Sequence, residues 1–586
     1  MGFFLSKRRN LILFLFVLLF SIFANPFIHL VRAQDTPIFS FRDRFHPVTA
    51  ENGMVATQEA IATQAGLDVL KEGGNAIDAA VTVGFTLAVT LPYAGNIGGG
   101  GFMLVHLADS QQTLAIDYRE KAPKAATRDM FLDENGEADP QKSRFSHLSV
   151  GVPGTVAGLV LALEQYGTIS LERALQPAIA LAENGFIVTP SLATVLEFAR
   201  ERLTRYPATA AIFYHEDGTP YQVGERLIQK DLANSLKLIA KEGIDAFYRG
   251  EIAEAIATEM ANNAGLIAKE DLAAYQPAIR QPVKGTYRGY DIYSMPPPSS
   301  GGVHLIQILN LLESYPLREL GHNSAQTIHL MAESMKLAYA DRSKYLGDPD
   351  FVDVPVSGLI SKQYANRLRS QMSSSHATPS TEIAPGNPPI FWQESDETTH
   401  YSVVDKDGNA VTNTYTLNFS FGTGITVPGT GILLNNEMDD FSAKPGVPNA
   451  FGLIGGEFNA IAPEKRMLSS MTPTIVMKDG DVFLVTGSPG GSRIITTTLQ
   501  IILNAIDHQM NIAEATNAPR IHHQWLPDEL RIEKGLSPDT LALLQQKGYK
   551  IVTKNAMGST QSIMKIGHRL AGASDPRKLD ALTLGY

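Results

Sequence analysis

The chain has 586 residues, a formal net charge of −11, 44% hydrophobic residues and no cysteine. This composition supplies material for a large core, and the length exceeds one ordinary domain. The lack of cysteine excludes disulfides, thiolate metal sites, a cysteine nucleophile and a lipoprotein anchor, and the acidic balance argues against a nucleic-acid partner.

The N-terminus has the pattern of an export signal. Lys7-Arg8-Arg9 is basic, and residues 11–24 form an apolar run that is short for a membrane span. Val31-Arg32-Ala33 ends in a small residue but is not an ideal A-x-A site, so we predict cleavage after Ala33 or after Ala24, with an uncleaved anchor as the alternative. Removing residues 1–33, which carry four cations and no acid, takes the formal charge to −15. The sequence predicts a periplasmic protein, with secretion or inner-membrane anchoring as alternatives and membrane contact only if the segment stays.

The first part of the exported chain alternates helical and extended patterns. Residues 56–71 carry apolar side chains at helical spacing and end at Gly73-Gly74, and residues 79–91 form a second apolar segment. Residues 98–101 are all glycine and precede a strand-like run at 102–107. Because the glycine run lacks the features of a P-loop or a dinucleotide site, we predict a tight structural turn.

Helical pattern dominates residues 155–275, and the chain becomes strand-rich after residue 398. Helical periodicity is clearest at 156–166, 171–184, 232–241, 496–506 and 538–547. This mixture predicts layered α/β packing, and no low-complexity linker divides the chain.

A β-hairpin is predicted around Asp407. Residues 398–404 and 411–417 are β-prone, and a turn cluster separates them. A turn centred on Asp407 places residue 407−n opposite 407+n, so Thr398 would face Thr416. His400 and Thr414 would share that face of the sheet. Such threonine pairs commonly only hydrogen-bond each other, which is the structural alternative.

Thr398 can also be a nucleophile. A threonine hydroxyl needs a base, and the α-amino group freed by a cut just before the threonine can serve, with a pKa of about 7.7–8. An internal Thr398 can make that cut by attacking the Glu397 carbonyl, which gives an ester that water opens. The hypothesis is a precursor that cleaves itself between Glu397 and Thr398.

The segment Thr398-Thr399-His400-Tyr401-Ser402-Val403 resembles the start of the small subunit of γ-glutamyltranspeptidases. Other motifs of that family match, in order, at residues 98–102, 117–120, 296–302, 434–441, 468–473, 486–492 and 572–577. The similarity covers essentially everything after about residue 45. Each motif alone is weak, but so many in order are specific.

The resemblance implies an α/β (α+β) fold, the αββα four-layer sandwich of N-terminal-nucleophile hydrolases. It implies a signal peptide at 1–33, a large subunit at 34–397 and a small subunit at 398–586. Autoproteolysis would release the two subunits, which form one αββα unit as a heterodimer. No cofactor is expected. No metal is expected either, since His522 and His523 are adjacent and no HExxH motif accompanies them.

The resemblance also implies the chemistry. Thr398 would form a γ-glutamyl ester from glutathione or another γ-glutamyl donor, and water or an amino acid or peptide acceptor would resolve it. Thr416 would hold the Thr398 hydroxyl. Gly490 and Gly491 would supply the oxyanion hole, since no Cβ obstructs their N–H groups.

Other matching residues would hold the donor's amino-acid headgroup. Arg119 matches the clamp on its carboxylate, assisted by Ser469 and Ser470. The ammonium side is matched by Asn418, Glu437 and Asp440. Without the resemblance, the same local patterns are more typical of a surface ion pair at Arg119 and of a turn or helix cap at residues 439–440.

A departure from the family concerns the lid over the glutamyl pocket. Bacterial relatives with a lid often have a gating tyrosine, and the matching residue in the Pro/Gly-rich run 444–451 is Phe451. Without the hydroxyl bond, we predict looser closure and more hydrolysis relative to transfer.

Two other functions stay open. One is a glutaryl or cephalosporin acylase of the same fold, disfavoured because a glutaryl donor has no ammonium for Asp440. The other is a non-catalytic exported binding protein, disfavoured by the retention of Thr398, Thr416 and the Gly490-Gly491 pair.

Overall fold

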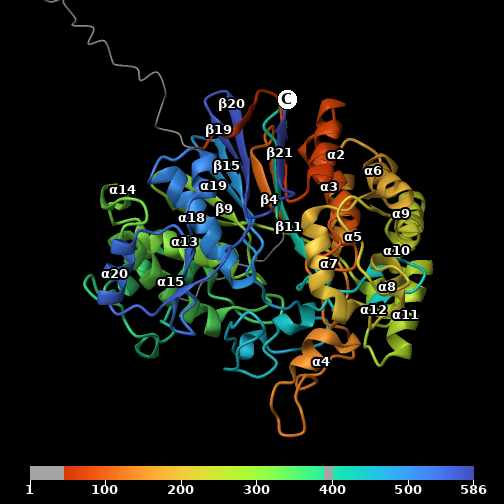
Figure 1. Cartoon of the computed structure of the whole chain (residues 1–586). Helices are drawn as coiled ribbons and strands as arrows, with labels where there is room; N and C mark the ends of the chain where they lie inside the picture. Colours follow the sequence, from red (N-terminus) through yellow and green to blue (C-terminus); the bar gives the residue numbers. More distant parts are fainter. Residues whose placement is uncertain (1–44, 389–399) are drawn as a thin grey trace, which may run out of the picture. The chain divides into compact units, whose positions relative to one another are not determined.

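Two seven-stranded antiparallel sheets lie between two groups of helices (Figure 1). The computed structural model describes residues 45–388 and 400–586, and His46–Tyr586 form one unit. The predicted signal segment at 1–33, Glu397 and Thr398 lie outside the described residues. No helix within the described ranges is both long enough and apolar enough to cross a membrane.

Both sheets mix strands from before residue 389 and after residue 399. The first sheet runs, in spatial order, β21 (Leu582–Gly585), β2 (Met54–Thr57), β10 (Tyr401–Val404), β11 (Ala410–Thr416), β3 (Gly100–Leu107), β4 (Gln112–Tyr118) and β7 (Ala278–Arg280). The second runs β1 (Val48–Ala50), β20 (Arg569–Ser574), β19 (Gln561–Ile566), β15 (Asp481–Thr486), β14 (Thr474–Lys478), β9 (Tyr290–Ser294) and β8 (Val283–Tyr287). Neither part of the chain could therefore complete a sheet alone.

Each sheet has its own helix layer (Figure 1). The layer on the first sheet includes α2 (Ala60–Lys71), α3 (Ala76–Thr90), α5 (Thr155–Tyr166), α6 (Leu171–Asn184), α7 (Pro190–Leu203), α9 (Lys230–Glu242), α10 (Ile244–Tyr248) and α11 (Glu251–Asn262). The layer on the second includes α13 (Gly301–Leu312), α15 (Ala325–Tyr345), α17 (Lys362–Arg369), α18 (Ile494–Ile506), α19 (Ile512–Asn517) and α20 (Pro538–Gln546). The predicted αββα sandwich is confirmed.

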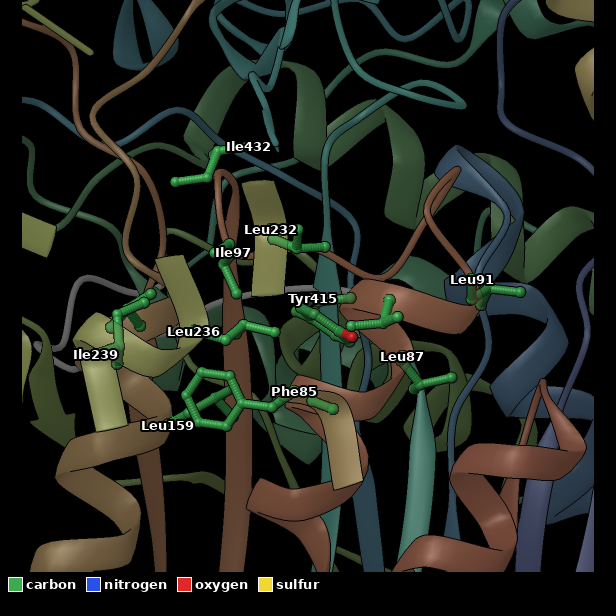
Figure 2. Packing of buried hydrophobic residues seen from close by; sticks show 14 of the residues in the cluster. Phe85, Leu87, Leu91, Ile97, Leu159, Leu232, Leu236, Ile239, Tyr415 and Ile432 are labelled. Carbon is green, nitrogen blue, oxygen red and sulfur yellow. The ribbon is translucent and has the colours of Figure 1, made fainter. Parts of the chain in front are cut away.

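Strand alternation explains how one chain fills three core layers. On β3, Phe102 and Leu104 pack between the two sheets, whereas Met103 and Val105 face the helices. Figure 2 shows the helix-side cluster, where Phe85 of α3 lies among apolar side chains from α5, α9 and β11. Helix α3 is buried all round, as its apolar composition requires.

The predicted hairpin register is confirmed where both strands are described. Strands β10 and β11 pair Tyr401 with Asn413 and Val404 with Ala410, which centres the turn on Asp407. The predicted partnership of Thr398 with Thr416 falls outside these described pairs.

Two local predictions need correction. The helix expected from residue 56 begins at Ala60, because residues 54–57 form β2 and the Glu59 side chain caps the helix. The glycine run is only partly a turn, since the backbone bends at residues 97–99 but Gly100 and Gly101 already belong to β3. Its glycines allow close packing instead: a Cβ on Gly99 would lie 2.0 Å from the Thr416 carbonyl oxygen.

Candidate active site

A cavity of about 260 Å³ collects most of the residues singled out in the sequence. Its lining includes Thr416, Asn418, Glu437, Asp440, Phe451, Ser469, Ser470, Gly490 and Gly491. Arg119 is not among the lining residues and lies behind Glu437 and Asp440, which it contacts. The site is therefore built from distant parts of the chain that the two sheets bring together.

Thr416 reaches the cavity because β11 ends there. Its Oγ1 accepts a hydrogen bond from the Asn418 backbone N–H at 2.7 Å. Asn418 adopts a left-handed backbone conformation, with φ of +74°, which asparagine tolerates better than most residues. The Asn418 amide donates to the Asn436 carbonyl at 3.0 Å. These bonds turn the chain at the strand end and hold both side chains in the cavity wall.

Three carboxylates surround the buried Arg119 guanidinium. Its Nη1 contacts Glu437 Oε1 and lies 3.6 Å from Glu120 Oε2, and its Nη2 lies 2.7 Å from Asp440 Oδ2. Glu437 Oε2 and both Glu120 oxygens are buried with no hydrogen-bond partner among the described residues. If all three carboxyls were ionised, the cluster would hold more negative charge than one guanidinium balances.

Burial shifts the titration of this cluster. It raises the pKa of Asp440 to about 6 and that of Glu120 to about 7, although Arg119 opposes both shifts. Burial also raises the pKa of Glu437 well above its usual range. A second cation entering the cavity beside Glu437 and Asp440 would therefore favour their ionised forms.

Arg342 is a cavity residue that sequence reasoning missed. It lies on α15, is buried, and donates from Nε to Ser300 Oγ at 2.9 Å. Its Nη2 donates to the Ser469 carbonyl and to Ser470 Oγ, each at 3.3 Å. Because Ser470 Oγ accepts from Arg342, its own hydrogen can be donated to another group. The sequence offered one clue, a charged residue within a long and largely buried helix, but this clue does not identify the partners of Arg342.

Gly490 and Gly491 lie just before the N-terminus of α18. Their φ angles of +136° and +57° are left-handed, and a Cβ on Gly491 would lie 2.5 Å from the Phe451 ring. Neither backbone N–H has an acceptor within the described ranges 45–388 and 400–586. With α18 starting at Ile494, the helix dipole also favours negative charge here. The segment suits a developing oxyanion.

Phe451 covers this glycine segment. Its ring packs edge-on against Phe419, with centroids 5.7 Å apart, and its backbone N–H donates to Asn449 Oδ1 at 3.0 Å. The Ala450 N–H donates to Asp439 Oδ2 at 3.4 Å. We call residues 444–452 the lid segment. In this chain its aromatic residue is held by packing and backbone bonds.

The adjacent histidines have structural partners. His522 contacts Thr496 Oγ1 at 2.9 Å and Gln524 Oε1 at 3.0 Å, and His523 Nε2 lies 3.3 Å from Asp528. Within the described part of the chain, no group of three or more His, Asp or Glu side chains is arranged to hold a metal ion.

Comparisons with known proteins agree with this geometry. The family model for γ-glutamyltranspeptidase matches residues 62–584. A glutathione hydrolase proenzyme of Escherichia coli strain K12 is 60% identical over 547 residues, which cover 93% of each chain. The crystal structure of a cephalosporin acylase from Bacillus halodurans superimposes with a TM-score of 0.83 at 30% identity, over 94% of this chain and 99% of that one. The Helicobacter pylori γ-glutamyltranspeptidase structure gives 0.56 at 47% identity, over 60% and 97%.

Proposed function

Because the chain belongs to the γ-glutamyltranspeptidase family, we propose that it is a self-processing γ-glutamyltransferase and glutathione hydrolase with Thr398 as its nucleophile. The observation that carries this proposal is one cavity that brings three features together. It joins Thr416 at the end of the predicted nucleophile hairpin, an acidic wall beside Arg119, and the Gly490-Gly491 pair.

Processing would come first. The Thr398 hydroxyl attacks the Glu397 carbonyl carbon, the peptide C–N bond breaks, and an ester links Glu397 to the Thr398 oxygen. Water then opens that ester, which leaves a Glu397 carboxylate and a free Thr398 α-amino group. The products would be a large subunit at 34–397 and a small subunit at 398–586. The interleaved sheets keep the two as one unit, since each contributes strands to both.

Catalysis would use the new N-terminus. The α-amino group takes the hydroxyl proton as Thr398 attacks the γ-carbonyl carbon of the donor, and Gly490-Gly491 N–H groups stabilise the oxyanion. The leaving amine takes that proton as the C–N bond breaks and a γ-glutamyl ester remains. Water or an amine acceptor then attacks the ester and restores the Thr398 hydroxyl.

Donor recognition would reorganise the acidic wall. The donor ammonium competes with Arg119 for Glu437 and Asp440, and this frees guanidinium N–H groups for the donor carboxylate. Ser470, whose oxygen accepts from Arg342, donates its hydrogen to the same carboxylate. The cluster therefore exchanges the internal ion pairs of Arg119 with Glu437 and Asp440 for ion pairs with the ammonium and the carboxylate of the substrate.

An acylase of the same fold would bind its acyl group differently. A glutaryl chain lacks the α-ammonium and leaves Glu437 and Asp440 facing only Arg119. The test compares γ-glutamyl-p-nitroanilide with glutaryl-p-nitroanilide on purified, processed protein. We expect at least a 100-fold preference for the γ-glutamyl compound in kcat/KM, roughly the 2.7 kcal/mol of one charge-assisted contact. Equal or reversed preference would replace the proposal with the acylase.

Donor capture should depend on pH. In the protein without donor, Asp440 and Glu120 have pKa values of about 6 and 7. At low pH, donor binding must therefore first remove protons from this cluster. We expect kcat/KM to rise as pH increases through 6 to 7. The bound ammonium lowers these pKa values, so the same limb in kcat should move to lower pH. Coincident limbs in both profiles would contradict a role in donor binding.

Phe451 sets the closure of the lid segment in this proposal. Phe451→Tyr adds a hydroxyl that can hydrogen-bond across the cavity, so we expect the ratio of hydrolysis to transfer to fall by about 2- to 5-fold, the size of one added bond. The measurement is release of p-nitroaniline with and without a dipeptide acceptor. Phe451→Leu, which cannot form the bond, is the control. An unchanged ratio for Phe451→Tyr discards the idea.

Export completes the proposal. The basic start and apolar run of residues 1–33 support a periplasmic location, with secretion or retention on the inner membrane as the alternatives.

A further inference from the structure

Gln524 is a buried amide whose oxygen accepts three hydrogen bonds. It follows β16 (Ile521–His522), and only 3% of its surface is exposed. Its Oε1 accepts from Ser492 Oγ at 2.8 Å, from Arg531 Nη1 at 2.9 Å and from His522 Nε2 at 3.0 Å. Ser492 directly follows Gly491, so the oxygen side of Gln524 is bonded to the oxyanion segment, residues 490–492.

The nitrogen side of the same amide is bonded to the lid segment. Its Nε2 donates to the carbonyls of Phe451 at 3.2 Å and Gly452 at 3.0 Å, and also to that of Leu526 at 3.3 Å. Carbonyls only accept and a guanidinium only donates, so the orientation of the amide is fixed. A carboxylate would face three carbonyls, and an apolar side chain would satisfy neither side.

The lid and the oxyanion segment also touch directly. The Phe451 ring lies so close to Gly491 that a Cβ there would be 2.5 Å from it. Tyr339 donates from its hydroxyl to the Ser492 carbonyl, which anchors the far side of the segment on α15. Ser492 is therefore held on one side by Tyr339 of α15. On the other side it is held by Gln524, which in turn is bonded to the lid segment.

We propose that Gln524 is a positioning residue that couples closure of the lid segment to the geometry of the oxyanion segment. When the lid lies over the cavity, its two carbonyls hold the Gln524 amide, and the amide oxygen holds Ser492 beside Gly491. Opening the lid removes those acceptors and loosens the hold on Ser492. The oxyanion hole is then best formed only over a covered donor. This inference rests on the proposed function for its catalytic consequence, but not for the structural link.

The main test is Gln524→Glu. The variant keeps the size and the acceptor face toward Ser492 and Arg531, and it replaces only the NH₂ that holds the lid. Gln500→Glu is the matched control. Gln500, which lies on α18, is another buried amide, and it donates to two carbonyls, those of Thr496 at 2.7 Å and Ile521 at 2.9 Å. Both variants place a carboxylate against carbonyl oxygens, but only Gln524 contacts the lid.

The first readout is chymotrypsin cleavage after Phe451, followed by mass spectrometry. Trypsin is unsuitable because Lys444 precedes proline. We expect cleavage about tenfold faster in Gln524→Glu, the size expected from losing two hydrogen bonds, and the parent rate in Gln500→Glu. The second readout is γ-glutamyl-p-nitroanilide hydrolysis, where we expect kcat about tenfold lower in Gln524→Glu alone.

The reciprocal variant is Ser492→Ala, which removes the bond on the other side of Gln524. Coupling predicts that lid cleavage also accelerates in this variant, by about threefold, although Ser492 donates no side-chain bond to the lid. Parent-like lid cleavage in Gln524→Glu would overturn the lid link. Parent-like cleavage in Ser492→Ala, or equal effects in the two Glu variants, would overturn the coupling. Cleavage is independent of turnover, so an inactive parent would reject the proposed function and leave this test in place.

Discussion

Thr398→Ala is expected to leave the chain uncut between residues 397 and 398 and to lower γ-glutamyl-p-nitroanilide turnover by about 10⁴-fold or more, as removal of a nucleophile does elsewhere. The physical reason is that one hydroxyl performs both reactions. It attacks the Glu397 carbonyl in the precursor and the donor γ-carbonyl in the mature protein. Intact mass and N-terminal sequencing of the parent and the variant measure the first effect.

Thr398→Ser is the matched control, since it keeps a hydroxyl on the same backbone. We expect it to process and to turn over, more slowly than the parent because the serine side chain is less restricted at χ1. The parent should yield one chain that begins near Gln34 and one that begins at Thr398. A parent that stays whole would mean that Thr398 only pairs with Thr416 across the strands. The hypothesis of a non-catalytic binding protein would then replace the proposed function. Processing in the alanine variant would place the nucleophile elsewhere.

Arg119→Gln is expected to lower kcat/KM for the γ-glutamyl donor by at least about 10³-fold and to destabilise the fold by about 3 kcal/mol at pH 7.5, because it leaves buried carboxylates without a cation. Glu437 and Asp440 both contact the Arg119 guanidinium directly, and Glu120 lies 3.6 Å from it. Unfolding by urea should be measured in the uncut Thr398→Ala background, so that single chains are compared.

The loss of stability should depend on pH with a definite sign. Asp440 and Glu120 have folded pKa values of about 6 and 7, above their ordinary ones, so the stability that these two groups contribute is present below about pH 4 and is lost as pH rises through 6 to 7. Without Arg119 their pKa values rise further. The defect of Arg119→Gln should therefore shrink at pH 5 and grow at pH 7.5.

Arg280→Gln is the control for removing a buried arginine. Arg280 binds Asp117 at 2.8 Å and Asp350 at 2.8 Å, away from the cavity. We expect it to cost stability while KM for the donor stays near the parent value. A donor KM raised equally in both variants would show that Arg119 acts only by supporting the fold.

The sequence alone determined the local features of this protein. The β10–β11 register follows from strand alternation around Asp407, and the helix at 171–184 was predicted to the residue, because both patterns depend on neighbours a few positions apart. The family motifs also marked nine of the residues that line the cavity. The start of α2 was missed because the capping bonds of Glu59 outweigh the apolar periodicity before Ala60.

Only the tertiary structure decided how those residues meet. Arg119 and Asp440 are 321 positions apart, and nothing in either segment shows that they form a buried ion pair. Arg342 and Gln524 gave no local signal because the partners that place them at the site are far away in the sequence: Arg342 donates to the Ser469 carbonyl, and Gln524 donates to the Phe451 carbonyl. Local hydrogen bonding and side-chain alternation specify strands and helices. Packing of the two sheets specifies which polar groups are buried together, and burial gives these groups their raised pKa values and their partners.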